Sequence, residues 1–169
     1  MQKKLNFFTK LGFLLTALAG TFLHFLYGLT GKTLWTGLFS SINESVWEHM
    51  KLVFFPLTAY FIFECLRLGS KVPALVSASP WGILSGTFSV PVVFYTYTGI
   101  LGRHITAVDI GIFLLGIFLG FYTQRTLIRR DTCPRTDNIF LPWSLVVLTG
   151  LCFFIFTFRP PSLPLFHRP

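Results

Sequence analysis

The densest group of reactive side chains in this sequence lies between residues 43 and 51. Two carboxylates, an imidazole, a hydroxyl and an ammonium group occur there, and at 100° per residue they share one face of a helix. They are Glu44, Ser45, Glu48, His49 and Lys51. Imidazole and carboxylate groups bind zinc, and a zinc site with an open position activates water. The same groups also suit general acid–base catalysis.

Two kinds of site are consistent with these residues. In the first, a divalent metal such as zinc is held by His24, Glu48, His49 and Asp109. In the second, Glu48, His49 and Asp109 are acid–base groups and Ser45 is the nucleophile. Neither site rests on a complete motif, because the chain has no His-Glu-x-x-His sequence. The residues expected to support the site are Asn43, Glu44, Trp47, Lys51, Arg103, His104 and Arg159.

Several of these residues also have ordinary structural explanations. Asn43 suits the start of a helix, because its side chain can cap a backbone N–H group. Glu48 and Lys51 are three residues apart and could pair with each other. Trp47 is typical of an anchor at the membrane interface. Asp109 is harder to explain in this way, since an acid inside a spanning helix usually has a function.

The composition places the chain among membrane proteins. It has 169 residues, of which 53% are hydrophobic and 12% are charged, whereas a soluble domain has about 25% charged residues. We predict an all-α fold, a polytopic membrane helix bundle that forms a single domain over residues 1–169. The five expected transmembrane helices cover residues 11–29, 46–68, 74–101, 105–128 and 139–158.

The basic residues indicate the orientation of these helices. With the N-terminus inside, nine of the 14 Lys and Arg residues lie in inner segments, so the positive-inside rule favours N-in and C-out. All four histidines and Asp109 then lie in the outer half. The net charge of +8 comes from these helix ends, and that distribution argues against nucleic-acid binding. The lipid bilayer is the expected partner.

The third expected helix is unusual. It is interrupted by Pro80 and Pro91 and is rich in Ser and Thr, as are helices that line transport sites. Two pairs of small residues also predict close helix contacts, within the chain or with a partner protein. These pairs are Gly82/Gly86 and Gly116/Gly120.

The sequence also predicts the structure of two segments outside these helices. We expect residues 30–42 to form a loop at the membrane interface. We also expect the prolines of residues 160–169 to prevent a helix there, while the Leu and Phe residues among them dock on the protein.

Two separate stretches resemble a known family. They are residues 43–51, Asn-Glu-Ser-Val-Trp-Glu-His-Met-Lys, followed by Phe-Phe-Pro at 54–56, and the tail Pro-Pro-x-x-Pro-Leu-Phe at 160–166. Both are similar to segments of an uncharacterised family of small bacterial multi-pass membrane proteins. The resemblance implies a location in the bacterial plasma (inner) membrane and carries no activity.

A looser resemblance is to the seven-helix receptor and ceramidase-like hydrolase superfamily, in which a Ser-x-x-x-His pair, an Asp and later histidines hold zinc. It implies such roles for Ser45, His49 and Asp109, although the later His-x-x-x-His is absent. We therefore expect a membrane protein with an outward-facing polar pocket that hydrolyses a lipid or lipid-linked substrate. The alternatives are a subunit that binds or transports a small solute, and an assembly partner without catalysis.

Overall fold

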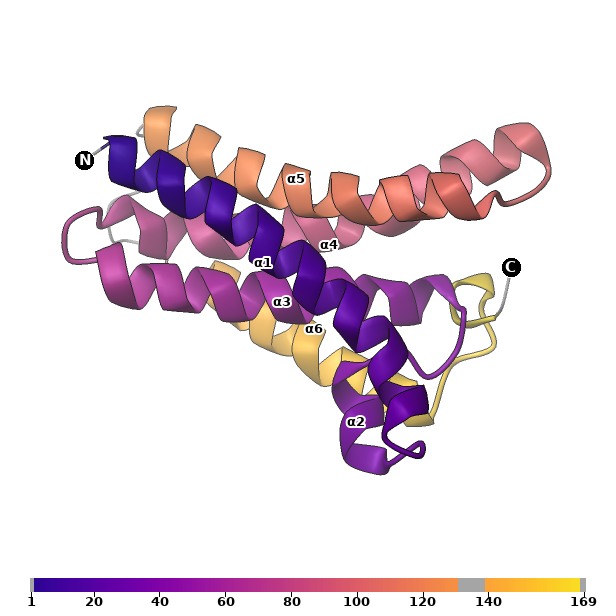
Figure 1. Cartoon of the computed structure of the whole chain (residues 1–169). Coiled ribbons are helices and arrows are strands. Elements are labelled where there is room, and N and C mark those ends of the chain that lie inside the picture. Colours follow the sequence, from indigo (N-terminus) through magenta and orange to yellow (C-terminus); the bar gives the residue numbers. More distant parts are fainter. Residues whose placement is uncertain (1, 131–138, 168–169) are drawn as a thin grey trace.

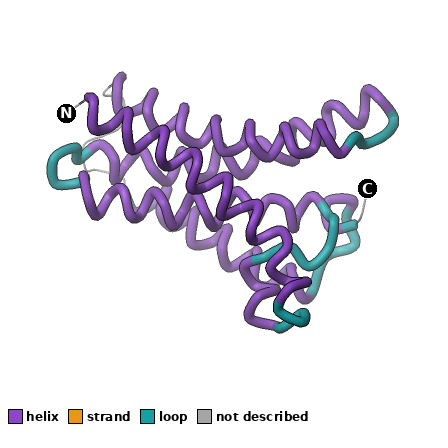
Figure 2. The backbone as a smooth tube through the Cα atoms, in the orientation of Figure 1, coloured by secondary structure: helices purple, strands orange, loops and turns teal. Residues whose placement is uncertain are grey.

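The computed structural model describes residues 2–130 and 139–167, and this part of the chain contains helices and loops but no strand (Figure 2). The five long helices run alternately in opposite directions, and the α3–α4 and α4–α5 turns lie at opposite ends of the bundle (Figure 1). The elements are α1 (Gln2–Leu29), α2 (Leu34–Phe39), α3 (Val46–Leu68), α4 (Ala74–Leu101), α5 (Thr106–Arg130), α6 (Phe140–Phe158) and the 3₁₀ helix η1 (Pro164–Phe166).

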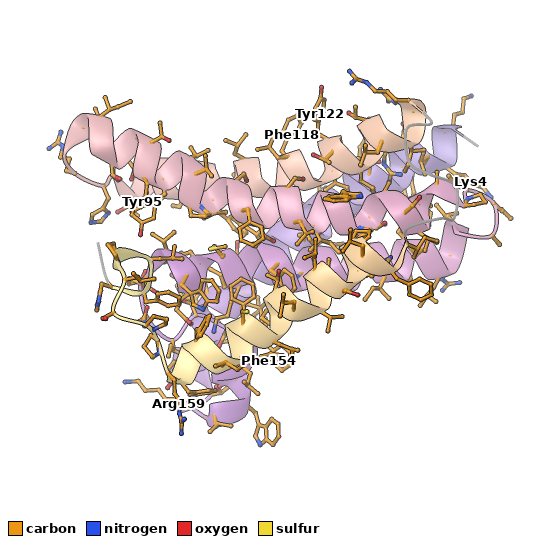
Figure 3. All side chains as sticks on the ribbon, turned by 180° about the vertical axis from the view of Figure 1, so that it is seen from behind. Lys4, Tyr95, Phe118, Tyr122, Phe154 and Arg159 are labelled. Atoms are coloured by element: carbon orange, nitrogen blue, oxygen red, sulfur yellow. The ribbon has the colours of Figure 1, made fainter. Side chains whose placement is uncertain are left out.

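Four of the long helices, α1, α4, α5 and α6, are long and apolar enough to cross a membrane. Their outward-facing side chains are largely apolar. Figure 3 shows Phe118 and Tyr122 of α5 pointing away from the bundle, and both are more than half exposed. This is the surface that a bilayer requires. The fifth long helix, α3, is not among these four, and three of its charged residues, Glu48, Lys51 and Glu64, are buried.

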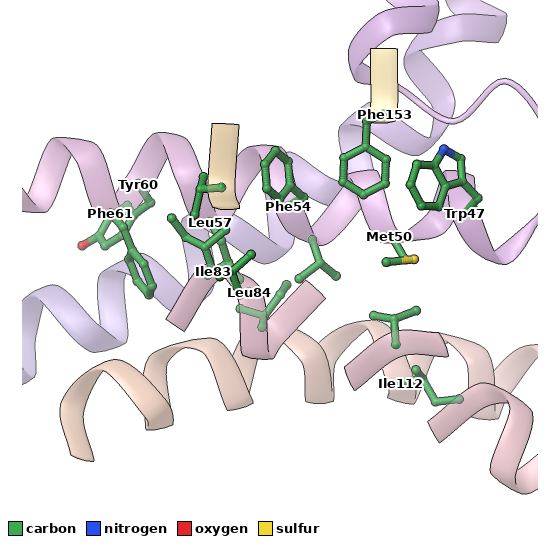
Figure 4. Packing of buried hydrophobic residues seen from close by; sticks show 14 of the residues in the cluster. Trp47, Met50, Phe54, Leu57, Tyr60, Phe61, Ile83, Leu84, Ile112 and Phe153 are labelled. Atoms are coloured by element: carbon green, nitrogen blue, oxygen red, sulfur yellow. The ribbon is translucent and has the colours of Figure 1, made fainter. Parts of the chain in front are cut away.

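Helix α3 lies at the centre of the bundle and contacts α1, α4, α5 and α6. Its residues Met50, Leu57 and Phe61 pack in the main core with Ile83 of α4 and Phe153 of α6 (Figure 4). Most residues of α3 are buried. A helix surrounded by protein can carry polar groups, because its neighbours supply their hydrogen-bond partners.

Helices α4 and α5 form a close antiparallel pair through their glycines. A Cβ atom at Gly86 would lie 2.7 Å from the carbonyl oxygen of Gly116, and one at Gly82 would lie 2.7 Å from that of Gly120. The two glycine faces predicted from the sequence therefore contact each other within the chain.

Two segments near the N-terminus differ from the sequence-based expectation. Helix α1 begins at Gln2 rather than near residue 11, so the basic N-terminal segment continues the helix. The short helix α2 lies within residues 30–42, where we expected a loop. Thr33 caps it, because its hydroxyl accepts a hydrogen bond from the N–H of Thr36.

The start of α3 has a different cap from the expected one. The N-cap is Ser45, whose hydroxyl accepts a hydrogen bond from the N–H of Glu48. Asn43 accepts a hydrogen bond from the N–H of Ser45 at 2.8 Å. Asn43 therefore shapes the turn that leads into the helix rather than capping the helix itself.

The C-terminal tail packs on the start of α3. Pro164 begins the single turn of η1, a position that tolerates proline because no N–H is required there. The prediction that the prolines prevent any helix is wrong for this one turn. The ring of Phe166 lies 4.8 Å from that of Trp47 and 5.7 Å from that of Phe156, measured between centroids.

Candidate metal centre

The end of α1 and the start of α3 bring two imidazoles and a carboxylate together. His24, Glu44 and His49 each offer a ligand atom, and these atoms lie within 4.8 Å of one another. The imidazole rings of His24 and His49 have their centroids 5.4 Å apart. Two of the four predicted metal ligands are therefore together, and Glu44 takes the place that we had expected for Glu48.

The distance between two of these groups suits a tetrahedral zinc ion. The Nε2 atom of His49 and the Oε2 atom of Glu44 are 3.4 Å apart. Zinc bonds of about 2.0–2.1 Å in a tetrahedron hold two ligand atoms roughly 3.3–3.4 Å apart. Two imidazoles and one carboxylate are also a ligand set of catalytic zinc sites, in which the fourth position stays open.

Hydrogen bonding prepares the imidazole of His49 for coordination. The Nδ1 atom of His49 lies 2.9 Å from the carbonyl oxygen of Ser45. Because a carbonyl oxygen only accepts, Nδ1 carries the proton and the lone pair of Nε2 is left for a metal. The Nδ1 atom of His24 is buried and has no hydrogen-bond partner among the described residues.

A second polar group lies at the turn between α4 and α5. Asp109 accepts hydrogen bonds on its two carboxylate oxygens, from the hydroxyl of Tyr97 on one and from Nδ1 of His104 at 3.3 Å on the other. The Tyr97 hydroxyl also accepts from the N–H of Ile105 at 3.1 Å. The carboxylate of Asp109 is therefore held in a fixed orientation.

Both polar groups line one pocket of about 480 Å³ between α1, α3, α4 and α5. This volume lies within the range of about 300–1,000 Å³ that is typical of small-molecule sites. His24, Glu44 and His49 line it from α1 and the start of α3, and His104 and Asp109 line it from the α4–α5 turn. The structure thus places His49 and Asp109 at the same pocket.

Glu48 and Lys51 lie outside this pocket and bind each other in the protein interior. Lys51 Nζ is 2.7 Å from Glu48 Oε2, and both side chains are almost fully buried. Lys51 also donates to the carbonyl of Gly37 at 2.9 Å and to Thr157 Oγ1 of α6 at 3.0 Å. Glu48 accepts a further hydrogen bond from the N–H of Ile42. Glu48 is therefore not placed among the metal ligands, because a buried ammonium group needs its counter-charge.

The remaining predicted residues are also placed by the structure. Ser45 is buried and its hydroxyl caps α3, so that it does not line the pocket as a nucleophile would. Trp47 is buried against Phe153, with ring centroids 4.6 Å apart, so its ring packs inside the protein. The two supporting residues that are exposed and do not line the pocket are Arg103 and Arg159.

The hydroxyl groups of α4 mostly bond to their own helix. Ser89 donates to the carbonyl of Gly86 at 2.7 Å, and Thr98 donates to that of Phe94 at 2.8 Å. Such bonds explain hydroxyl groups inside a helix without any ligand. Helix α4 contributes only Val90 and Phe94 to the pocket, and both are apolar.

A second buried polar network, which sequence reasoning missed, lies toward the opposite end of the bundle. Arg125 of α5 pairs with Glu64 of α3, and Gln124 Nε2 donates to Glu64 at 3.0 Å and to Ser79 at 2.9 Å. Arg125 is one of the nine basic residues in the expected inner segments, which indicate only orientation. Its position inside a long apolar helix could have indicated the pairing, because ionisable residues there usually have partners.

The fold and this site define a helical membrane protein with a pocket at one end of its bundle that is mostly apolar and holds five ionisable residues. No curated protein and no solved structure matches the chain. The chain belongs to the family described as "Family of unknown function (DUF6512)", whose family model matches residues 2–168. The match covers nearly the whole chain, in agreement with the resemblance to an uncharacterised family.

Proposed function

We propose that this protein is a membrane metalloenzyme of the hydrolytic type, in which His24, Glu44 and His49 hold a zinc ion. The observation that carries the proposal is the grouping of three ligand atoms within 4.8 Å at the pocket. Bound there with an open position, a zinc ion supplies Lewis acidity and lowers the pKa of a coordinated water. The hydrogen bond from His49 to Ser45 supports the proposal, since such outer bonds orient metal ligands.

The other polar residues of the pocket have separate roles in this proposal. Asp109 is the group that accepts a proton from the attacking water, because it is the one carboxylate that the α4–α5 side contributes to the pocket. Tyr97 and His104 are positioning residues, since each bonds one oxygen of Asp109. Glu48 and Lys51 stabilise the loop and helix start that present Glu44 and His49.

The proposal includes a membrane topology. Helix α3 is the fifth membrane-spanning segment, because it lies among four helices that are apolar enough to cross. Three of its charged residues, Glu48, Lys51 and Glu64, are buried among those neighbours. The basic residues then favour an inner N-terminus, which places the pocket on the outer side of the bacterial plasma membrane.

Replacing His49 with alanine is expected to abolish stoichiometric zinc binding. The purified protein, incubated with zinc in detergent and freed of excess metal, should retain about one zinc ion per chain. His49→Ala and His24→Ala remove one of three ligands and should retain far less. Inductively coupled plasma mass spectrometry of the same samples measures zinc and protein sulfur together.

The matched control is His167→Ala, because His167 is an exposed histidine that does not line the pocket. This variant should keep the zinc content of the wild-type protein. Equal zinc content in His49→Ala and His167→Ala, or none in the wild-type protein, would contradict the metal centre.

A further inference from the structure

The pocket has a gradient of polarity along the helices. Its ionisable residues lie toward the end of the bundle that holds the α4–α5 turn, and apolar lining residues of α3 and α5 lie deeper. On α5, Phe113 is four residues and about 6 Å beyond Asp109 along the helix axis. On α3, Leu52 likewise lies about one turn beyond His49. A ligand that fills the pocket therefore needs a polar end and an apolar end.

The mouth of the pocket has an exposed apolar rim. Phe25 of α1 and Ile110 of α5 both line the pocket, and their side chains are 59% and 57% exposed. Both residues lie inside helices that are apolar enough to cross a membrane. Figure 1 shows α1 diverging from the α4–α5 hairpin toward this end of the bundle. The exposed apolar rim thus opens between α1 and α5 into lipid.

A glycine closes the floor of the pocket. A Cβ atom at Gly20 would lie 2.5 Å from the carbonyl oxygen of Leu52 and 2.7 Å from the ring of Phe113. The absence of a side chain lets α1 approach α3 and α5 at this depth. The pocket is therefore closed at the depth of Gly20 and open at its side, between α1 and α5.

We propose that this pocket takes an amphiphile with a single acyl chain, which enters sideways from the bilayer between α1 and α5. Its chain occupies the apolar floor at Leu52, Ile112 and Phe113, and its oxygen-bearing head group lies at His24, Glu44 and His49. The inference rests on the proposed metal centre for the position of the head group. It deepens that proposal by naming the substrate class and its route.

Ile110→Trp tests the route, because the larger ring fills the mouth from an exposed position that the fold tolerates. The probe is laurate, and acetate carries the same head group without the chain. Zinc-loaded wild-type protein should bind about one laurate, and Ile110→Trp should bind it at least about tenfold more weakly. Native mass spectrometry of the detergent-solubilised chain counts the bound laurate.

The control is Ile155→Trp on α6, because Ile155 is also 57% exposed and does not line the pocket. It should bind laurate as the wild-type protein does. The proposal is overturned if the two variants bind laurate equally, if acetate displaces laurate, or if the zinc-loaded wild-type protein binds none. Zinc content is measured in the same samples. A protein that holds zinc but no laurate refutes this inference alone, and one that binds laurate without zinc refutes the metal centre.

Discussion

Lys51→Met is expected to lower the free energy of unfolding by about 3–5 kcal/mol, because it leaves the buried carboxylate of Glu48 without its counter-charge. Both side chains are almost completely buried, so water cannot replace the lost ammonium group. The carbonyl of Gly37 and the hydroxyl of Thr157 would lose a donor as well. Denaturant unfolding in mixed micelles measures the change.

Two further variants separate charge burial from other effects. Lys71→Met removes an exposed lysine and should change stability by less than about 0.5 kcal/mol. Glu48→Gln in the Lys51→Met background removes the stranded charge, so it should recover part of the loss. If Lys51→Met and Lys71→Met were equally stable, the buried pair would not be formed.

Gly86→Ala is expected to separate α4 from α5 and to destabilise the bundle by about 1–3 kcal/mol or more. The new Cβ atom would lie 2.7 Å from the carbonyl oxygen of Gly116 and 3.2 Å from the Cα of Gly120. These are backbone atoms, so neither can turn aside as a flexible side chain would. The thermal midpoint of the protein in detergent should fall.

Gly99→Ala is the control on the same helix, because no heavy atom lies within 4 Å of the Cβ position there. Alanine is also the better helix former, so this variant should be as stable as the wild-type protein or slightly more stable. A thermal midpoint for Gly86→Ala as high as that for Gly99→Ala would show that the two helices are not in close contact.

The helices could be predicted from the sequence largely because their ends carry local signals. Helices α3 and α4 have the bounds 46–68 and 74–101 that we expected from the sequence. Gly69 and Pro73 separate them, and Gly102 ends α4 in the left-handed conformation that favours glycine. Helix α2 was missed because its six residues have too little periodicity to distinguish a short helix from a loop.

The site was predicted only in part because its residues depend on contacts between helices. A helical wheel puts Glu44 and Glu48 on the same face and cannot separate them. What separates them is Thr157 of α6, which joins the Glu48–Lys51 pair from the far end of the chain. The imidazole rings of His24 and His49 lie close together because α1 packs against α3. A single sequence does not reveal that packing.

The hydrogen bond between Lys51 and Thr157 has a consequence for the biosynthesis of the protein. Thr157 follows Lys51 by 106 residues, so the ribosome makes α3 long before it makes α6. Until α6 emerges, the ammonium group of Lys51 lacks one of its three acceptors and is poorly suited to lipid. The hydrogen bonds of Lys51 are therefore complete only after the last long helix of the chain has been made.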